Sequence, residues 1–219
     1  GDVPAPDEYL YTDAAAGDGE QVNALLAATI DLTPGMVVAD IGAGHGFYAL
    51  QAARRVHPGG RVYATDIAPD ALETIRVSIE AAPDRDTLAE TVALRLVQGA
   101  GATGLEDLPG GSLDLITMFR VFTFGREDLG ADVEFLRSLQ RTLRPGGRLA
   151  YHIDVVQDPD YREYLTILMR LAGFTGAVTE IPMPAHIPAE LMHYQWDCVN
   201  AREPMIQMYR GVILIFRKG

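Results

Sequence analysis

Short apolar runs alternate along the chain with longer stretches whose apolar positions recur at helical spacing. Such alternation predicts an α/β fold, in which a mostly parallel sheet is covered by helices on both faces. The expected strands are 36–40, 61–65, 92–97, 113–118 and 148–153, with 178–181 and 208–216 as candidates that close the sheet edge. The expected helices are 20–30, 47–56, 69–81, 129–143 and 161–172.

A few segments differ from this alternating pattern. Residues 1–18 are rich in proline and acidic residues and are predicted to form an N-terminal arm, which leaves 19–219 as a single domain. Within that domain, 182–206 is Pro-rich and irregular, and we expect it to be an insertion that covers the substrate. Residues 84–90 are predicted to be a polar connection, and Pro145–Gly147 a turn.

Composition narrows the possible partners and compartments. The 219 residues carry a net charge of −12, which makes a nucleic-acid partner unlikely, and no apolar run is long enough to span a bilayer. A single cysteine, Cys198, excludes an internal disulfide and fits a cytoplasmic protein. The sequence begins with Gly1, so export after removal of a leader stays open. A monomer and a homodimer are both compatible with these features.

The most informative segment is a strand-like run that enters a glycine-rich turn. Residues 37–46 read V-V-A-D-I-G-A-G-H-G, and a helical pattern follows. Glycine allows a tight turn and a close approach of backbone to a ligand, and the helix start at Gly46 is expected to offer backbone N–H groups. Asp66 ends the next strand, where a carboxylate can accept hydrogen bonds from both hydroxyls of a ribose.

Two nucleoside cofactors fit a turn of this kind. A dinucleotide site has the spacing G-x-G-x-x-G/A, but here the third glycine, Gly46, comes one residue early and Phe47 stands where a small residue is required. Asp40 precedes the loop, and its negative charge suits a ligand with an ammonium and a sulfonium group. These features favour S-adenosylmethionine over NAD.

Four segments in the same order resemble motifs of the class I S-adenosylmethionine-dependent methyltransferases. They are D-I-G-A-G-H-G at 40–46, Y-A-T-D-I at 63–67, G-G-S-L-D-L-I at 110–116 and L-R-P-G-G-R-L at 143–149. The resemblance covers about residues 20–155. It implies a doubly wound, Rossmann-like sheet of seven strands whose last strand is antiparallel.

The resemblance also implies roles for individual positions. The loop would hold the methionine part of the cofactor, the residues after the second and third strands its ribose and adenine, and those after the fourth strand would line the methyl-transfer cavity. The cofactor-binding residues expected in this way are Asp40, Ile41, Gly42, Ala43, Gly44, His45, Gly46, Asp66, Ile67, Gly99, Ala100, Phe119 and Arg120. An acidic residue common in the family after the third strand is missing, because the run there reads Q-G-A-G-A.

The acceptor side has weaker signals. His152, with Asp154 two residues later, is a candidate general base at the end of the fifth strand, although a structural histidine is the alternative. Candidate acceptor contacts are Tyr9, Tyr11, Phe122, His186, His193, Tyr194 and Trp196. No metal site is expected. The predicted function is methyl transfer to a small organic acceptor. Peptide or protein methylation, a non-catalytic S-adenosylmethionine-binding protein and a nicotinamide oxidoreductase remain alternatives.

Overall fold

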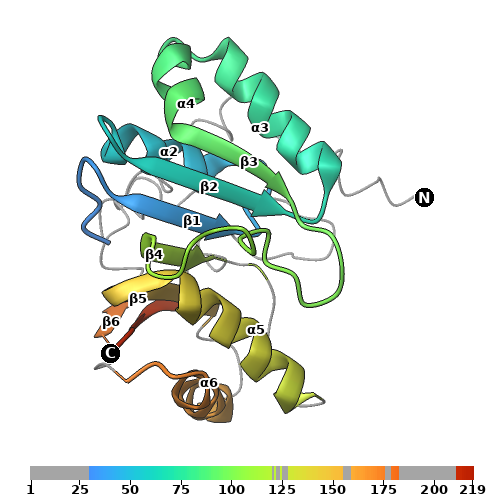
Figure 1. Cartoon of the computed structure of the whole chain (residues 1–219), viewed down its shortest axis with the longest axis vertical. Helices are drawn as coiled ribbons and strands as arrows, with labels where there is room; N and C mark the ends of the chain where they lie inside the picture. Colours follow the sequence, from blue (N-terminus) through green and yellow to red (C-terminus); the bar gives the residue numbers. More distant parts are fainter. Residues whose placement is uncertain are drawn as a thin grey trace.

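A computed structural model of the chain describes residues 30–119, 121, 124, 128–154, 159–175, 179–182 and 211–219. Seven strands form one sheet in the order β3-β2-β1-β4-β5-β7-β6 (Figure 1). The strands are β1 (Val37–Ile41), β2 (Arg61–Asp66), β3 (Val92–Leu96), β4 (Leu113–Met118), β5 (Leu143–Asp154), β6 (Thr179–Pro182) and β7 (Gly211–Arg217). The helices are α2 (Phe47–Val56), α3 (Pro69–Ala81), α4 (Arg85–Thr91), α5 (Leu129–Thr142) and α6 (Pro159–Leu171).

Strand directions agree with the expected topology. The pairs β1–β2, β1–β4, β2–β3 and β4–β5 are parallel, whereas β7 runs antiparallel to both β5 and β6. The prediction of a mostly parallel, seven-stranded sheet with an antiparallel last strand is therefore confirmed. Most of the expected helix 20–30 and most of the expected insertion 182–206 lie outside the described residues.

Helix α2 shows how the sequence pattern becomes structure. Its buried positions include Ala49, Ala52, Ala53 and Val56, which share one face at helical spacing. Three of them are alanines, so the helix axis can approach the sheet closely. The next helix, α3, begins with Pro69, whose missing N–H is not needed in a first helical turn.

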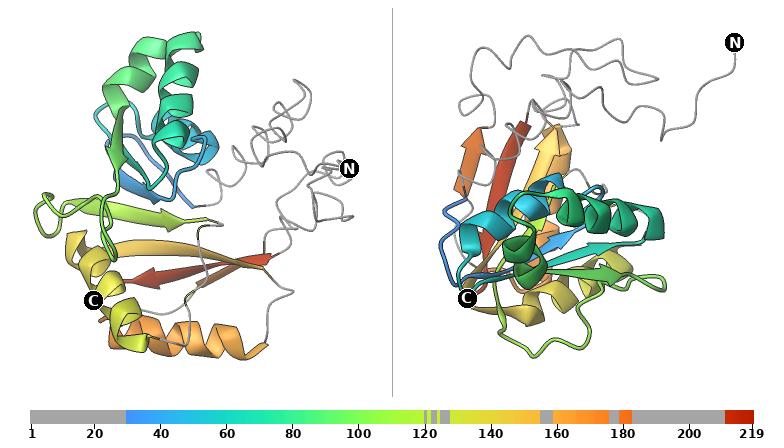
Figure 2. Two further views of the ribbon diagram at one scale, coloured as in Figure 1. Left: turned by 90° about the vertical axis from the view of Figure 1, so that its right-hand side faces the viewer. Right: turned by 90° about the horizontal axis from the view of Figure 1, so that it is seen from above.

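Helices cover both faces of the sheet (Figure 2). Each face has its own apolar core. On one face, α2, α3 and α4 pack on Val38, Val62 and Leu115. On the other face, α5 and α6 pack on Ile116 and Leu149. Successive strand residues point to opposite faces, so Asp40 and Thr117 lie on the face covered by α2.

Two local predictions are wrong. Residues 84–90, expected as a polar connection, include helix α4, because Leu88 is fully buried against the α2 side of the core. Pro145–Gly147, expected as a turn, lies within β5, where the β4–β5 register shifts. The C-terminal tail pairs with this irregular segment, in which Gly146 has a positive φ of 73°: Gly146 N–H donates to the Lys218 carbonyl at 2.9 Å and Lys218 N–H donates to the Gly147 carbonyl at 2.9 Å.

Candidate cofactor site

The predicted cofactor residues gather at the carboxyl edge of the sheet. Strand β1 lies between β2 and β4. After β1 the chain forms β2 and then β3 on one side of β1, and it then crosses to form β4 on the opposite side. Such a switch point opens a crevice beyond the strand ends, where doubly wound folds bind ligands. The glycine loop after β1, Asp66 at the end of β2 and Phe119 after β4 all reach this edge.

The three glycines of the loop differ in their surroundings. All have positive φ, with values of 70° at Gly42, 53° at Gly44 and 82° at Gly46. A Cβ atom at Gly42 would lie 2.4 Å from Val121, and one at Gly46 would lie 2.6 Å from Ile75. A Cβ at Gly44 would meet no atom of the described residues within 4 Å. The outer two glycines therefore serve internal packing, and Gly44 presents bare backbone to open space.

Asp66 connects the loop to the end of β2. Its Oδ2 accepts a hydrogen bond from Gly44 N–H at 2.8 Å, and its Oδ1 accepts one from Ala68 N–H at 2.9 Å. Asp66 therefore stabilises the start of α3 and the glycine loop at once. Each carboxylate oxygen has a second lone pair, so both can still accept from the hydroxyls of a ribose.

Backbone hydrogen bonds inside the loop change one expectation. The N–H of Gly46 is not open to a ligand, because it donates to the Ala43 carbonyl at 2.9 Å. Ala43 N–H in turn donates to the Thr65 carbonyl at 2.9 Å. His45, next in the loop, is half-buried. Backbone hydrogen bonds thus hold the loop together, and the N–H of Gly46 itself is not offered to a ligand.

Asp40 is a buried acid beneath the loop. Asp40 is only 3% exposed, and Thr117 Oγ1 donates a hydrogen bond to Asp40 Oδ1 at 2.8 Å. Burial raises the pKa of the Asp40 carboxyl to about 7, the Thr117 hydroxyl lowers that pKa, and the nearby charge of Asp66 raises it. A cation bound beside this acid would favour its ionised form.

Two further residues, Thr117 and Tyr48, lie beside Asp40 and were not predicted from the sequence. In the sequence, the only signal for Thr117 is a hydroxyl side chain in the otherwise apolar end of a strand. Tyr48 is 6% exposed, and its hydroxyl has no hydrogen-bond partner in the described part of the chain. Its ring packs edge-on against Phe119, with centroids 4.8 Å apart and planes at 76°. Burial raises the pKa of the Tyr48 hydroxyl well above its usual range, and the charge of Asp40 raises it further.

The residues expected near adenine lie on the same edge. Ile67, directly after Asp66, is 78% exposed, which is unusual for a large apolar side chain. Gly99 has φ of 100°, and a Cβ there would also meet nothing within 4 Å. Ala100 beside it is exposed. Because β3 ends beside β2, these residues and Ile67 can border one flat ligand surface.

His152 lies on the face of the sheet that carries Thr117. The β4–β5 register pairs Thr117 with Ala150, so His152 lies two residues further toward the carboxyl edge. It is buried, at 9% exposed, and pairs with Ile213 of β7. The side chain of Asp154 is outside the described residues, as are Arg120, Phe122, Tyr9, Tyr11, His186, His193, Tyr194 and Trp196.

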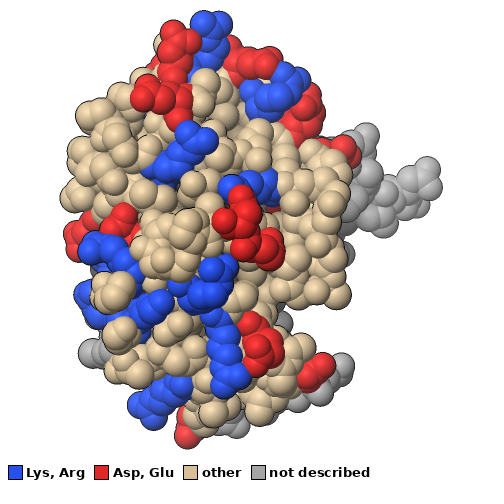
Figure 3. All heavy atoms as spheres, in the orientation of Figure 1, with Lys and Arg blue, Asp and Glu red and all other residues tan. Residues whose placement is uncertain are grey.

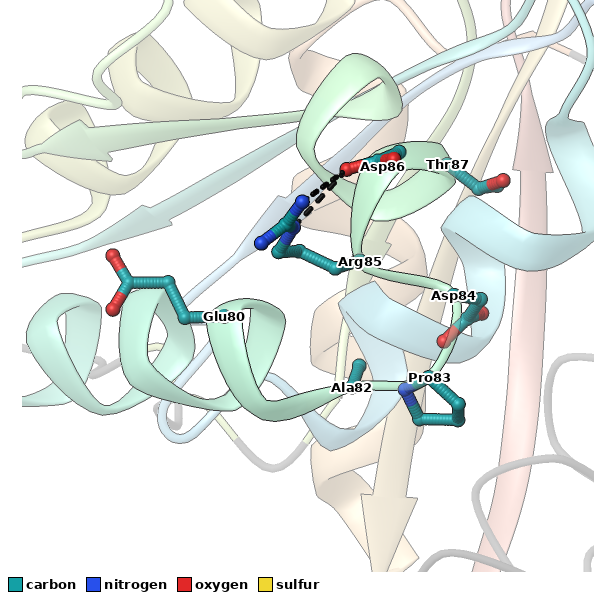
Figure 4. A pocket seen from close by; sticks show the side chains of 7 residues that line it. All are labelled: Glu80, Ala82, Pro83, Asp84, Arg85, Asp86 and Thr87. Carbon is teal, nitrogen blue, oxygen red and sulfur yellow. Dashed lines mark hydrogen bonds and ion pairs between the residues drawn. The ribbon is translucent and has the colours of Figure 1, made fainter.

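Two other surface features lie away from this site. A hollow of about 340 Å³ is lined by the end of α3 and the start of α4 (Figure 4). Its charged groups are already paired, Asp84 with Arg54 and Arg85 with Asp86. Because α3 runs back from the carboxyl edge, this hollow is near the amino ends of the strands. Basic side chains gather at the lower left of the surface, near the C-terminus, so they also lie away from the crevice (Figure 3).

Metal and membrane features are limited within the described ranges. There, no group of three or more His, Cys, Asp or Glu side chains could hold a metal ion. Among the helices that the structure describes, none has the length and apolarity to cross a bilayer.

The family described as "Methyltransferase domain" matches residues 38–147 of this chain. The chain belongs to this methyltransferase family. The match spans the glycine loop, Asp66 and β4, and so contains most of the crevice described above. Membership of this family and the class I motifs imply S-adenosylmethionine as the cofactor.

Individual relatives agree with the assignment. Nocamycin O-methyltransferase of Saccharothrix syringae is 32% identical over 73% of this chain and 52% of that protein. Protein-L-isoaspartate O-methyltransferase of Aeropyrum pernix is 34% identical over 48% of this chain and 36% of that protein. The chain thus spans about half or less of these two curated relatives. A solved S-adenosylmethionine-dependent methyltransferase of Aquifex aeolicus shares the fold, with a TM-score of 0.58, 19% identity and 98% coverage of both chains.

The crevice of this methyltransferase fits its cofactor on physical grounds. Two acidic residues lie at this edge of the sheet: Asp40, which is buried and accepts from Thr117, and Asp66, which accepts from the loop. Negative charge there would suit a ligand that carries an ammonium and a sulfonium. Beside Gly44, whose N–H donates to Asp66, the described residues leave open space. A dinucleotide would instead bring a pyrophosphate toward the loop above Asp40, and an ionised Asp40 would repel it. Asp66 fits the ribose of either cofactor, so the spacing of the glycine loop and the position of Asp40 are the features that disfavour the nicotinamide alternative.

Proposed function

We propose that this methyltransferase transfers a methyl group from S-adenosylmethionine to a small organic acceptor. The observation that carries the proposal is the backbone of Gly44, which faces open space while its N–H is held by Asp66. Bound there, the sulfonium of the cofactor supplies a methyl carbon that is already activated for attack. The protein must then place the acceptor in line, about 3 Å from that carbon, and exclude water.

Each described residue has a role in this proposal. Asp66 accepts from the ribose hydroxyls, and the exposed side chain of Ile67 packs on the adenine. Asp40 favours the cationic end of the cofactor. Phe119, held by Tyr48, forms a wall of the cavity after β4. The expected insertion 182–206 and the N-terminal arm 1–18 would cover the acceptor.

An oxygen acceptor is the class we favour. Both curated relatives named above are O-methyltransferases, one of them acting on protein isoaspartate by its name. A hydroxyl acceptor needs its proton removed, and His152 is the buried imidazole on the cofactor face that we assign as general base. Because one relative is named as a protein-L-isoaspartate O-methyltransferase, a peptide or protein acceptor is our second candidate. We also propose a cytoplasmic monomer or homodimer with 19–219 as one domain.

Calorimetry and a methyl-release assay test this proposal. S-adenosylmethionine and its demethylated product are titrated into the full chain, and turnover is then measured with a panel of small hydroxyl and carboxyl acceptors and with an isoaspartyl peptide. Binding with turnover of a small acceptor supports the proposal. Turnover of the peptide alone selects the second candidate, and binding without any turnover identifies a non-catalytic binder. Absence of binding rejects all three.

Replacement of Asp66 by alanine is expected to weaken cofactor binding by about 1–3 kcal/mol, because the ribose hydroxyls lose their acceptor. The backbone N–H of Gly44 also loses its partner, so thermal unfolding is measured beside the titration. Asp70→Ala, which changes an exposed acid on α3, is the matched control. Unchanged affinity of Asp66→Ala in titration calorimetry would remove the ribose assignment.

A further inference from the structure

Asp40 and Thr117 form a buried polar pair at the centre of the sheet. They are direct cross-strand partners of β1 and β4, and the Thr117 hydroxyl donates to the carboxyl at 2.8 Å. Thr117 is fully buried, and Asp40 is 3% exposed. A carboxyl withdrawn from water ionises at a large energetic penalty unless charges or several hydrogen bonds compensate.

The charged and titratable groups around Asp40 give little compensation when no ligand is bound. Asp66, on β2, is a second acid and disfavours ionisation of Asp40. Tyr48 faces it from α2, and Arg148 and Arg55 act on that tyrosine. His152 shares the same sheet face, and His45 lies in the adjacent loop. A cation in the open space beside Gly44 would supply the missing opposite charge.

We propose that Asp40 releases a proton when the cationic cofactor binds, and that Thr117 is the positioning residue that holds this carboxyl ready to ionise. In this step the O–H bond of the Asp40 carboxyl breaks and its proton passes to the solvent, with no other bond changed. Thr117 acts through its hydroxyl, which donates to the charged form and so favours it. The inference rests on the proposed function, because it requires S-adenosylmethionine in the crevice.

Burial already places this equilibrium in the neutral range. The pKa of Asp40 is raised to about 7, so in the free protein a large fraction of this carboxyl holds its proton at pH 6. Removal of the Thr117 hydroxyl would raise this pKa further, because one hydrogen bond to the charged form is lost. Cofactor binding to the altered protein would then require a higher pH.

Calorimetry on the parent protein tests the proton release directly. S-adenosylmethionine is titrated at pH 6 in phosphate and in a second buffer with a larger ionisation enthalpy, and the difference in heat gives the number of protons released. We expect close to one proton per cofactor bound. Binding without proton release overturns the proposal and leaves the proposed function standing. Absence of binding overturns both.

Thr117→Val tests the positioning role, since valine keeps the shape and removes the hydroxyl. Relative to the parent, we expect affinity to fall about tenfold at pH 6 and about twofold at pH 8, from one lost charge-assisted hydrogen bond. Thr117→Ser should restore the parent pH profile. Thr142→Val, at a buried threonine whose hydroxyl donates to a helix carbonyl, is the control.

The pH dependence separates positioning from simple packing. Using the ratio of variant to parent affinity cancels any titration of the cofactor itself. An equal loss at every pH, or a Thr117→Ser variant that behaves like Thr117→Val, contradicts the positioning role. If Thr117→Val does not fold, the proton count on the parent and the Thr117→Ser profile still decide the question.

Discussion

Gly44→Val is expected to abolish cofactor binding while the fold is retained. Valine methyl groups at this position would enter the open space that we assign to the methionine part of the cofactor. Among the described residues no atom lies within 4 Å of the added Cβ, so the core that they form is not disturbed. The positive φ of 53° adds backbone strain of about 1–2 kcal/mol, which reduces stability without unfolding the domain. Titration calorimetry and circular dichroism measure the two effects.

Gly35→Val is the matched control for this substitution. Gly35 also has a positive φ, of 85°, and a Cβ there also meets nothing within 4 Å. It precedes β1 and therefore lies at the opposite, amino edge of the sheet. Both variants carry comparable strain, but only Gly44→Val should lose the cofactor. Normal binding by Gly44→Val, or equal loss by both variants, would refute this placement of the ligand.

Asp40→Asn is expected to make the free protein more stable than the parent above pH 7. The folded-state pKa of Asp40 is about 7, against 3.8 for an ordinary aspartate. The stability that comes from holding the proton is therefore fully present below pH 4 and is lost as the pH rises through 7. At about 1.4 kcal/mol per pH unit, the parent loses roughly 2–4 kcal/mol across this range. Asparagine does not ionise and avoids this loss.

Urea unfolding of the parent and of Asp40→Asn at pH 5 and pH 8.5 provides the measurement. The amide oxygen can still accept from Thr117, so the two proteins should be closer in stability at pH 5 than at pH 8.5. Asp70→Asn, at an exposed position on α3, should show no such pH dependence relative to the parent. A stability difference that does not change with pH would show that Asp40 is ionised throughout. Asp40→Asn is also expected to bind the cofactor more weakly, which is the usual trade between stability and function.

Much of the architecture could be read from local patterns. Helices 47–56 and 69–81 and strand 113–118 were predicted with the bounds that the structure shows, since apolar spacing and the flanking glycines and prolines act within a few residues. The strand, glycine loop and following acid indicated the nucleoside site for the same reason. The prediction failed where burial of a side chain determines the local structure. Residues 85–91 form a helix and not a connection, because Leu88 is buried in the core.

The sequence by itself determined which residue types stand in the proposed cofactor site, but the tertiary structure decided the surroundings of each one. Three glycines look alike in the chain, yet Val121 and Ile75 occupy the space beside two of them and leave only Gly44 open. Thr117 reaches Asp40 across 77 positions because β1 and β4 pair in that register. Ligand access and the proton affinity of a buried acid depend on atoms that are distant along the chain, so only the folded sheet sets them.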